Sequence, residues 1–160
     1  MLKRYEPPSD FLKAVIAEEV PLTGSQFAHA NLSRLIELTR DPDRANRDWA
    51  TLLLSQEGGD APAVCAALRQ AASDEDEVVR AEAVLGLASR DPEGALPLVQ
   101  AALRADTVAI PMLEAATVCA HPSLIADLRV WAEPSDRPFA DALAAEALAA
   151  CMRGANDDRD

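Results

Sequence analysis

The sequence predicts an all-α protein, and three observations carry that prediction. Alanine supplies 33 of the 160 residues, and it is the residue that costs least in a helix. Only 4% of the residues are aromatic, so small aliphatic side chains must build the core. No sustained alternation of apolar and β-branched residues is present, and no Asn-Gly or Asp-Gly turn joins such runs.

The first helix is expected within PSDFLKAVIAEEVP, residues 8–21. Ser9 or Asp10 can serve as its N-cap, because both side chains accept hydrogen bonds from a first helical turn. A helix in front of a repeat array covers the face that the end repeat would otherwise expose. Residues 1–24 are therefore predicted to be an N-terminal segment with a capping helix. Its apolar stripe at helical spacing consists of Phe11, Leu12, Val15 and Ile16.

A repeat of about 33 residues follows this segment. DPDRANRDWATLLL, residues 41–54, aligns without a gap on DEDEVVRAEAVLGL, residues 74–87, at a shift of 33. Weaker copies follow at further shifts of 32 and 30, in which Met112 and Ala142 take the place of Arg80. The repeat domain is predicted over residues 25–153, followed by a short, frayed acidic tail over residues 154–160.

Helix-start signals divide each unit into two helices. Asp60 precedes Pro62, and Asp91 directly precedes Pro92; aspartate is a favoured N-cap and proline a favoured first helical residue. Pro111 is expected to delay the second helix of the third unit by several residues.

The pattern Asp-x-Asp-x-x-Val-Arg-x-x-Ala-x-x-x-Leu, present as DEDEVVRAEAVLGL, resembles the HEAT repeat, and in particular the short bacterial HEAT-like units. The resemblance implies a right-handed α-α superhelix, a solenoid of about four antiparallel helix pairs. It also implies that the turn aspartates and the arginine of the second helix hydrogen-bond within and between repeats. This structural ladder would consist of Asp41, Asp43, Arg47, Asp74, Asp76 and Arg80.

A shallow apolar groove is the candidate partner-binding surface. In HEAT-like proteins the second helices line the concave face, and a helical wheel puts an apolar stripe of this chain there. The alternative is that lateral helix contacts already cover these side chains. Trp49 aligns with Glu82 and Glu114, which predicts partial exposure, and tryptophan is a common interface anchor. The candidate partner-binding residues are Trp49, Leu52, Ala81, Leu85, Ala88 and Leu113.

The net charge of the chain indicates which classes of partner it can bind. The net charge is −12, and residues 48–160 carry all of it because residues 1–47 are neutral overall. Such a surface repels phosphate, so nucleic-acid binding is not expected, whereas a basic protein partner is compatible with it. A surface that serves only solubility is the alternative explanation.

No motif for catalysis, metal binding or phosphate binding is present, and no cofactor is expected. His29 and His121 have no HExxH or His-Cys grouping around them, and the three cysteines lack CxxC spacing, which favours reduced, mostly buried thiols. The sequence contains neither a membrane-spanning apolar run nor a signal-peptide pattern, which favours a cytoplasmic protein.

The leading hypothesis is a non-enzymatic module that binds a protein or peptide on the concave face. A more specific version is an acidic inhibitor or immunity protein that neutralises a basic toxin. The alternative from another class is an enzyme, since the HEAT-like proteins that the repeats resemble include bilin lyases.

Overall fold

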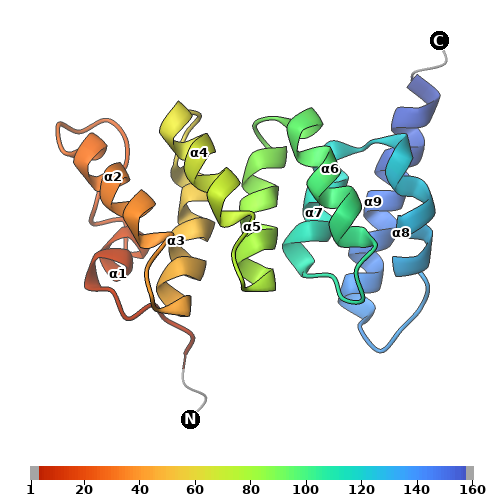
Figure 1. Cartoon of the computed structure of the whole chain (residues 1–160), viewed down its shortest axis with the longest axis horizontal. Coiled ribbons are helices and arrows are strands. Elements are labelled where there is room, and N and C mark those ends of the chain that lie inside the picture. Colours follow the sequence, from red (N-terminus) through yellow and green to blue (C-terminus); the bar gives the residue numbers. More distant parts are fainter. Residues whose placement is uncertain (1–3, 158–160) are drawn as a thin grey trace. The chain divides into compact units, whose positions relative to one another are not determined.

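A computed structural model of the chain describes residues 4–157, and all regular structure in that range is helical. Figure 1 follows the chain through these helices. After α1 they form four consecutive pairs, which confirms the predicted all-α, HEAT-like fold. The helices are α1 (Asp10–Ile16), α2 (Ala28–Leu38), α3 (Arg44–Glu57), α4 (Pro62–Ala71), α5 (Glu77–Ala88), α6 (Pro92–Leu103), α7 (Ile110–Cys119), the 3₁₀ turn η1 (Pro122–Leu124), α8 (Ile125–Trp131) and α9 (Pro138–Asp157).

The chain divides into two compact units, Met1–Ala83 and Val84–Asp160. In the first unit, α1 packs on α3, α2 packs on α3, and α3 packs on α4. Ser9 is the N-cap of α1, because its hydroxyl accepts from the backbone N–H of Leu12 at 3.3 Å. The helix buries most of its predicted apolar stripe, although Ile16 stays exposed.

An aspartate begins α3 and a proline begins α4, whereas Asp60 does not cap α4, whose N-cap is Ala61 without a side-chain hydrogen bond. Asp43 caps α3 by accepting from the backbone N–H of Asn46 at 3.1 Å. Pro62 opens α4, where its missing N–H costs nothing. The core between these helices is aliphatic and includes Leu35, Leu54, Val64, Leu68 and Val79.

In the second unit α7 and α9 pack closely, α6 packs on α7, and α8 packs on α9. Asp91 caps α6 by accepting from the N–H of Gly94 at 3.0 Å. Pro111 lies in the first turn of α7, where proline is well accepted. The helix begins at Ile110, one residue after the position equivalent to the start of α5, so the predicted delay of several residues is wrong. The core here is built largely from alanine, with Ala95, Ala115, Ala116, Ala144 and Ala147 all buried.

The end of the chain differs from the predicted frayed tail. Helix α9 continues through residues 154–157, because the run of alanines before them favours helix and no proline follows; Gly154 lies within the helix. Residues 158–160, the rest of the predicted tail, lie outside the described residues.

Candidate functional site

An ion pair joins the first two repeats within the first unit. Arg47 Nε donates to Asp74 Oδ2 at 2.9 Å, and Arg47 Nη2 donates to Asp74 Oδ1 at 3.3 Å. The same guanidinium also reaches the backbone carbonyls of Asp41 and Pro42. Both side chains are about one-tenth exposed, at 11% for Arg47 and 10% for Asp74. A charged pair this well enclosed is hydrogen-bonded on nearly every side, as burial of charge requires.

The turn aspartates of the two repeats order their own turns. Asp41 Oδ1 accepts from the N–H of Asp43 at 2.8 Å, and Asp74 Oδ1 accepts from the N–H of Asp76 at 2.9 Å. Asp76 in turn accepts from the backbone N–H of Val79 at 3.1 Å at the start of α5. The four predicted acids therefore hold the two turns in the same way.

Arg80 differs from its repeat equivalent Arg47. Its Nη1 donates to the carbonyl oxygens of Asp74 at 2.7 Å and Glu75 at 2.9 Å, both in its own turn. Arg47 makes the corresponding carbonyl contacts and also reaches the next turn. A tie from Arg80 to a third repeat stays a prediction.

A second ion pair between the repeats had no signal in the sequence. Arg44 Nε donates to Asp76 Oδ2 at 2.7 Å, with the Arg44 side chain 46% exposed. The hydrogen bond from Arg44 holds the pKa of Asp76 below its ordinary value, and the backbone N–H of Val79 acts in the same direction. The equivalent of Arg44 in the next repeat is Glu77, so the repeat pattern could not have predicted this pair.

Three of the predicted partner-binding residues are almost fully buried, although Leu113 also lines a cleft of the second unit. Ala81 and Ala88 are fully buried, and Leu113 is 1% exposed. The prediction of one continuous groove through these residues is wrong. The helical wheel assigns one face of each second helix to solvent, but α7 packs against both α6 and α9, so side chains on more than one of its faces are covered. Small side chains allow helices to approach closely enough for this.

Trp49 and Leu52 remain partly exposed and lie in one cleft of the first unit, whereas the half-buried Leu85 lies in the second unit. We name it the Trp49 cleft. It has a volume of about 370 Å³ and lies between α3 and the end of α1 with the loop that follows. Its walls are mainly Ile16, Val20, Leu22, Trp49, Leu52 and Leu53, and the exposed carboxylates of Glu18 and Glu57 also line it.

The loop that forms one wall of the Trp49 cleft is held in place locally. Glu18 adopts a left-handed backbone conformation with φ 59°, which ends α1 and turns the chain. The Asn31 side chain, on α2, donates to the carbonyl of Pro21 at 2.9 Å. The cleft is therefore formed by an ordered wall, which suits a site that exists before its ligand binds.

The N-terminal segment also packs on Trp49. The ring of Tyr5 stacks on the Trp49 indole with centroids 6.1 Å apart. The Tyr5 hydroxyl donates to Asp48 Oδ2 at 2.7 Å and accepts from Arg44 Nη1 at 3.1 Å. Partial burial and the hydrogen bond to the Asp48 carboxylate raise the pKa of Tyr5 to about 12. Tyr5 and Arg44 are the residues of this site that sequence reasoning missed, since contacts 43 residues apart leave no local pattern.

Trp49 also carries an unusual polar atom. Its Nε1 is buried and has no hydrogen-bond partner among the described residues. A buried N–H without an acceptor is uncommon in folded proteins, because the N–H of a buried tryptophan usually finds a partner.

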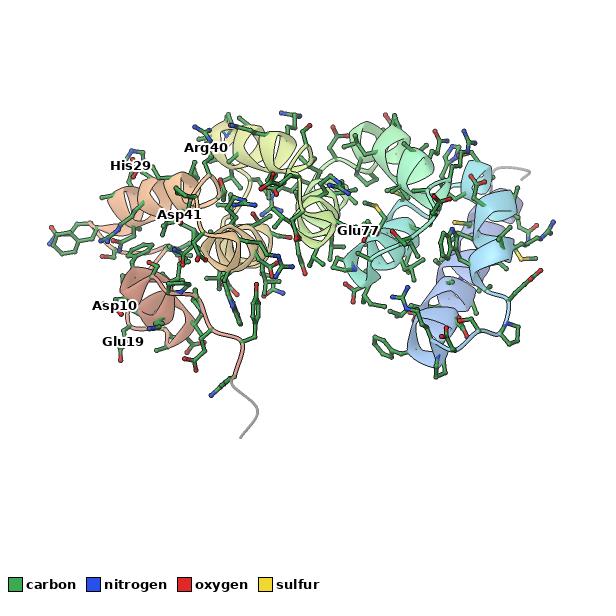
Figure 2. The ribbon with its side chains drawn as sticks, turned by 60° about the horizontal axis from the view of Figure 1, so that its bottom comes forward. Asp10, Glu19, His29, Arg40, Asp41 and Glu77 are labelled. Carbon is green, nitrogen blue, oxygen red and sulfur yellow. The ribbon has the colours of Figure 1, made fainter. Side chains whose placement is uncertain are left out.

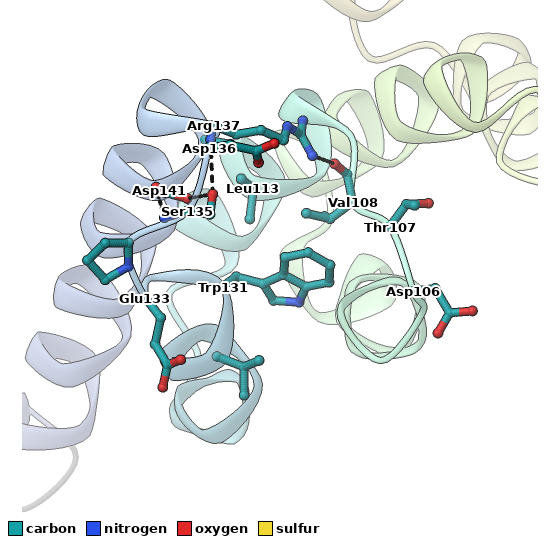
Figure 3. A pocket seen from close by; sticks show the side chains of 13 residues that line it. Asp106, Thr107, Val108, Leu113, Trp131, Glu133, Ser135, Asp136, Arg137 and Asp141 are labelled. Carbon is teal, nitrogen blue, oxygen red and sulfur yellow. Dashed lines mark hydrogen bonds between the residues drawn. The ribbon is translucent and has the colours of Figure 1, made fainter.

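A second cleft, of about 420 Å³, lies in the second unit. We name it the Trp131 cleft (Figure 3). The Trp131 indole projects between the loop of Asp106–Val108 and the loop of Ser135–Arg137. Its Nε1 donates to the carbonyl of Leu103 at 2.8 Å, which fixes the ring. The apolar walls are Val108, Leu113, Val130, Trp131, Pro134 and Ala140.

Polar contacts order the loop on one side of the Trp131 cleft. Ser135 donates to Asp141 twice, from its backbone N–H and from its hydroxyl, each at 2.7 Å. These two bonds hold the pKa of Asp141 below its ordinary value, and the bond from the Ser135 hydroxyl has the larger effect. Arg137 Nη1 donates to the carbonyl of Val108 at 3.4 Å, which joins the two loops.

Within residues 4–157, the histidines and cysteines are not grouped into a catalytic or metal-binding site. Figure 2 shows His29 pointing outward from its helix, and the His121 side chain caps the η1 turn. Burial raises the pKa of the Cys119 thiol to about 11, which disfavours the reactive thiolate. No group of three or more His, Cys, Asp and Glu in this range could hold a metal ion. No helix in the described part of the chain has the length and apolar character to cross a membrane.

The comparison with protein families decides the family. A family model described as HEAT repeats matches residues 32–118, which is more than half of the chain. The chain belongs to the HEAT-repeat family. The resemblance inferred from the repeat pattern is thus confirmed, and the matched residues include the Arg47–Asp74 pair and the α3 wall of the Trp49 cleft.

One solved structure with the same type of fold is the X-ray structure of YibA from Escherichia coli. The two chains are 22% identical, with a TM-score of 0.59, and the match covers 85% of this HEAT-repeat chain and 54% of YibA. The chain therefore spans about half the length of that protein. At this identity the likeness shows the fold alone. A search of curated proteins gave no significant match.

Proposed function

We propose that this HEAT-repeat protein is a non-enzymatic interaction module that binds a protein or peptide through the Trp49 cleft. The observation that carries the proposal is that Trp49 and Leu52 line one partly exposed apolar cleft together. HEAT repeats typically serve as scaffolds for protein interactions, which supports this class of function.

The cleft favours a partner segment with an apolar anchor next to a basic residue. Its walls are mostly aliphatic and aromatic, which suits a leucine, methionine or phenylalanine side chain. The carboxylates of Glu18 and Glu57 line it without any cation paired to them among the described residues. A lysine or arginine beside the anchor would complement these two charges, and the net charge of −12 would speed the encounter. We do not expect nucleic acid to bind, because phosphate would be repelled.

A display library of random peptides, selected on the immobilised full chain, tests the proposal directly. The expected outcome is enrichment of peptides that combine one large apolar residue with Lys or Arg. Binding of the enriched peptide should fall by about tenfold or more in Leu52→Asp, since a buried charge in an apolar contact costs over 1 kcal/mol.

Val118→Asp is the matched control, because Val118 is an exposed apolar residue on α7, outside both clefts. It adds the same charge to the protein and should leave the affinity of the peptide unchanged. Equal loss of affinity in both variants would point to net charge instead of the cleft. If the enriched peptides bind Leu52→Asp as tightly as the wild type, the Trp49 cleft is not the binding site.

A further inference from the structure

We infer that the Trp131 cleft is a second, separate binding site that takes a basic side chain of a partner, arginine or lysine, with its aliphatic stem on the indole. This inference concerns the second unit and does not depend on the Trp49 cleft.

The walls suit the stem of a long basic side chain. The Trp131 ring is fixed by its hydrogen bond to the Leu103 carbonyl, so it offers a preformed aromatic surface. Val130 is 67% exposed beside it, and Pro134 continues the apolar surface. Lysine and arginine bury their methylene groups along such surfaces, and their charged ends favour the face of tryptophan over other aromatic rings.

The unpaired charges of the cleft are negative. Asp141 is committed to Ser135, but the carboxylates of Asp106, Glu133 and Asp136 have no hydrogen-bond or ion-pair partner in the described part of the chain. All three are exposed, and they belong to the two loops on either side of the indole. Three free carboxylates around an apolar, aromatic cavity attract a cation and repel an anion.

Arg137 is the one cation that lines the cleft, and it would oppose a second cation nearby. Its guanidinium donates to the carbonyl of Val108 and lies beside that residue. Figure 3 shows Asp106 and Glu133 on opposite sides of the indole, both away from Arg137. We therefore place the bound cation beside the indole, between Glu133 and Asp106 and away from Arg137.

The test uses N-acetyl-arginine amide as the probe and N-acetyl-citrulline amide as its neutral, nearly isosteric counterpart. Both are titrated into the ¹⁵N-labelled full chain, and backbone and indole resonances are followed by NMR. The arginine probe should shift the signals of residues 106–108 and 133–137 and the indole signal of Trp131. The citrulline probe should shift them much less at the same concentration.

Two charge variants sharpen the test. Glu133→Gln and Asp106→Asn are expected to raise the Kd of the arginine probe by about two- to fivefold each, the usual effect of one exposed charge. Glu114→Gln is the matched control, because Glu114 is an exposed acid on α7 of the same unit that does not line the cleft. It removes the same charge and should leave the Kd unchanged.

Three outcomes would overturn the inference: equal shifts with both probes, shifts scattered over the acidic surface, or equal weakening by Glu133→Gln and Glu114→Gln. The Trp49 cleft has its own readout, since Leu52→Asp should not change the shifts around Trp131. Failure of this inference and failure of the proposed function are thus distinguishable.

Discussion

Arg47 reaches from the second helix of one repeat to the turn of the next, where its Nε lies 2.9 Å from Asp74 Oδ2 and both side chains are almost enclosed. The guanidinium also donates to two backbone carbonyls of its own turn. One side chain thus connects two turns that lie 33 residues apart in the repeat pattern.

Arg47→Ala should lower the free energy of unfolding by about 3 kcal/mol, because it leaves the enclosed Asp74 carboxylate without its partner. Arg44→Ala is the control, since Arg44 pairs with Asp76 at a more exposed position and should cost less than about 1 kcal/mol. Urea unfolding followed by circular dichroism measures both. Equal losses in the two variants would show that enclosure of the Arg47 pair has no energetic consequence.

Thr51→Val should stabilise the protein by about 1 kcal/mol. The Thr51 side chain is fully buried and its hydroxyl has no hydrogen-bond partner among the described residues. Removing this hydroxyl from water therefore costs free energy that no hydrogen bond in the folded protein offsets. The repeat equivalent of Thr51 is Val84, which shows that the shape of valine fits this position. Thr117→Val should not stabilise, because the Thr117 hydroxyl donates to the Leu113 carbonyl at 3.2 Å. A loss of stability in Thr51→Val would contradict the prediction.

Tyr5 is the single tyrosine of the chain, so its ionisation can be followed by the ultraviolet absorbance of tyrosinate. The midpoint should lie near the pKa of about 12 in the folded protein, compared with 10.0 for an unperturbed phenol. Asp48→Asn should lower the midpoint, because the carboxylate disfavours the phenolate. Since the folded pKa is raised, stability should be complete below pH 10.0 and fall as the pH rises toward 12. A midpoint at 10.0 while circular dichroism still shows folded protein would refute the partial burial of Tyr5 and its hydrogen bond to Asp48.

The pH dependence of stability should contain a contribution from Asp76. Its folded pKa lies below the ordinary value of 3.8, so its stabilisation is complete above 3.8 and is lost as the pH falls through the folded pKa. Asp76→Asn should be less stable at neutral pH and should lose less stability on acidification. Urea unfolding from neutral pH to about 3 measures this difference, and parallel curves for both proteins would exclude the contribution.

Gly154→Ala should destabilise the second unit by about 1–3 kcal/mol. A methyl group at Gly154 would lie 2.5 Å from the carbonyl oxygen of Ala120, at the end of α7. In an exposed helix the same change would instead stabilise by about 1 kcal/mol, because alanine is the better helix former. The sign of the change in thermal unfolding temperature decides whether α9 packs on the end of α7 this closely.

The repeats and their helix starts could be predicted because their causes are local. Asp43 and Asp91 cap helices by contacts to residues three positions away, and the shift of 33 aligns Asp41 with Asp74 and Arg47 with Arg80. Burial was less predictable. A wheel assigns Ala81 and Leu113 to a face, but only the packing of neighbouring helices decides whether that face is covered.

The two clefts could be predicted only in part. Trp49 was identified because it aligns with Glu82 and Glu114, and Leu52 because a helical wheel put it on the apolar stripe of the predicted groove. Tyr5 and Arg44 were missed because stacking and ion pairing between residues about 40 positions apart follow from the fold and leave no sequence pattern. The Trp131 cleft was missed for the same reason, since two separate loops meet around one indole.

The two tryptophans have a practical consequence beyond binding. Each compact unit contains one of them, Trp49 in the first and Trp131 in the second, in different polar surroundings. The variants Trp49→Phe and Trp131→Phe would thus each leave a single fluorophore that reports on one unit. Comparing their denaturation midpoints measures the folding cooperativity of the chain with its own intrinsic probes.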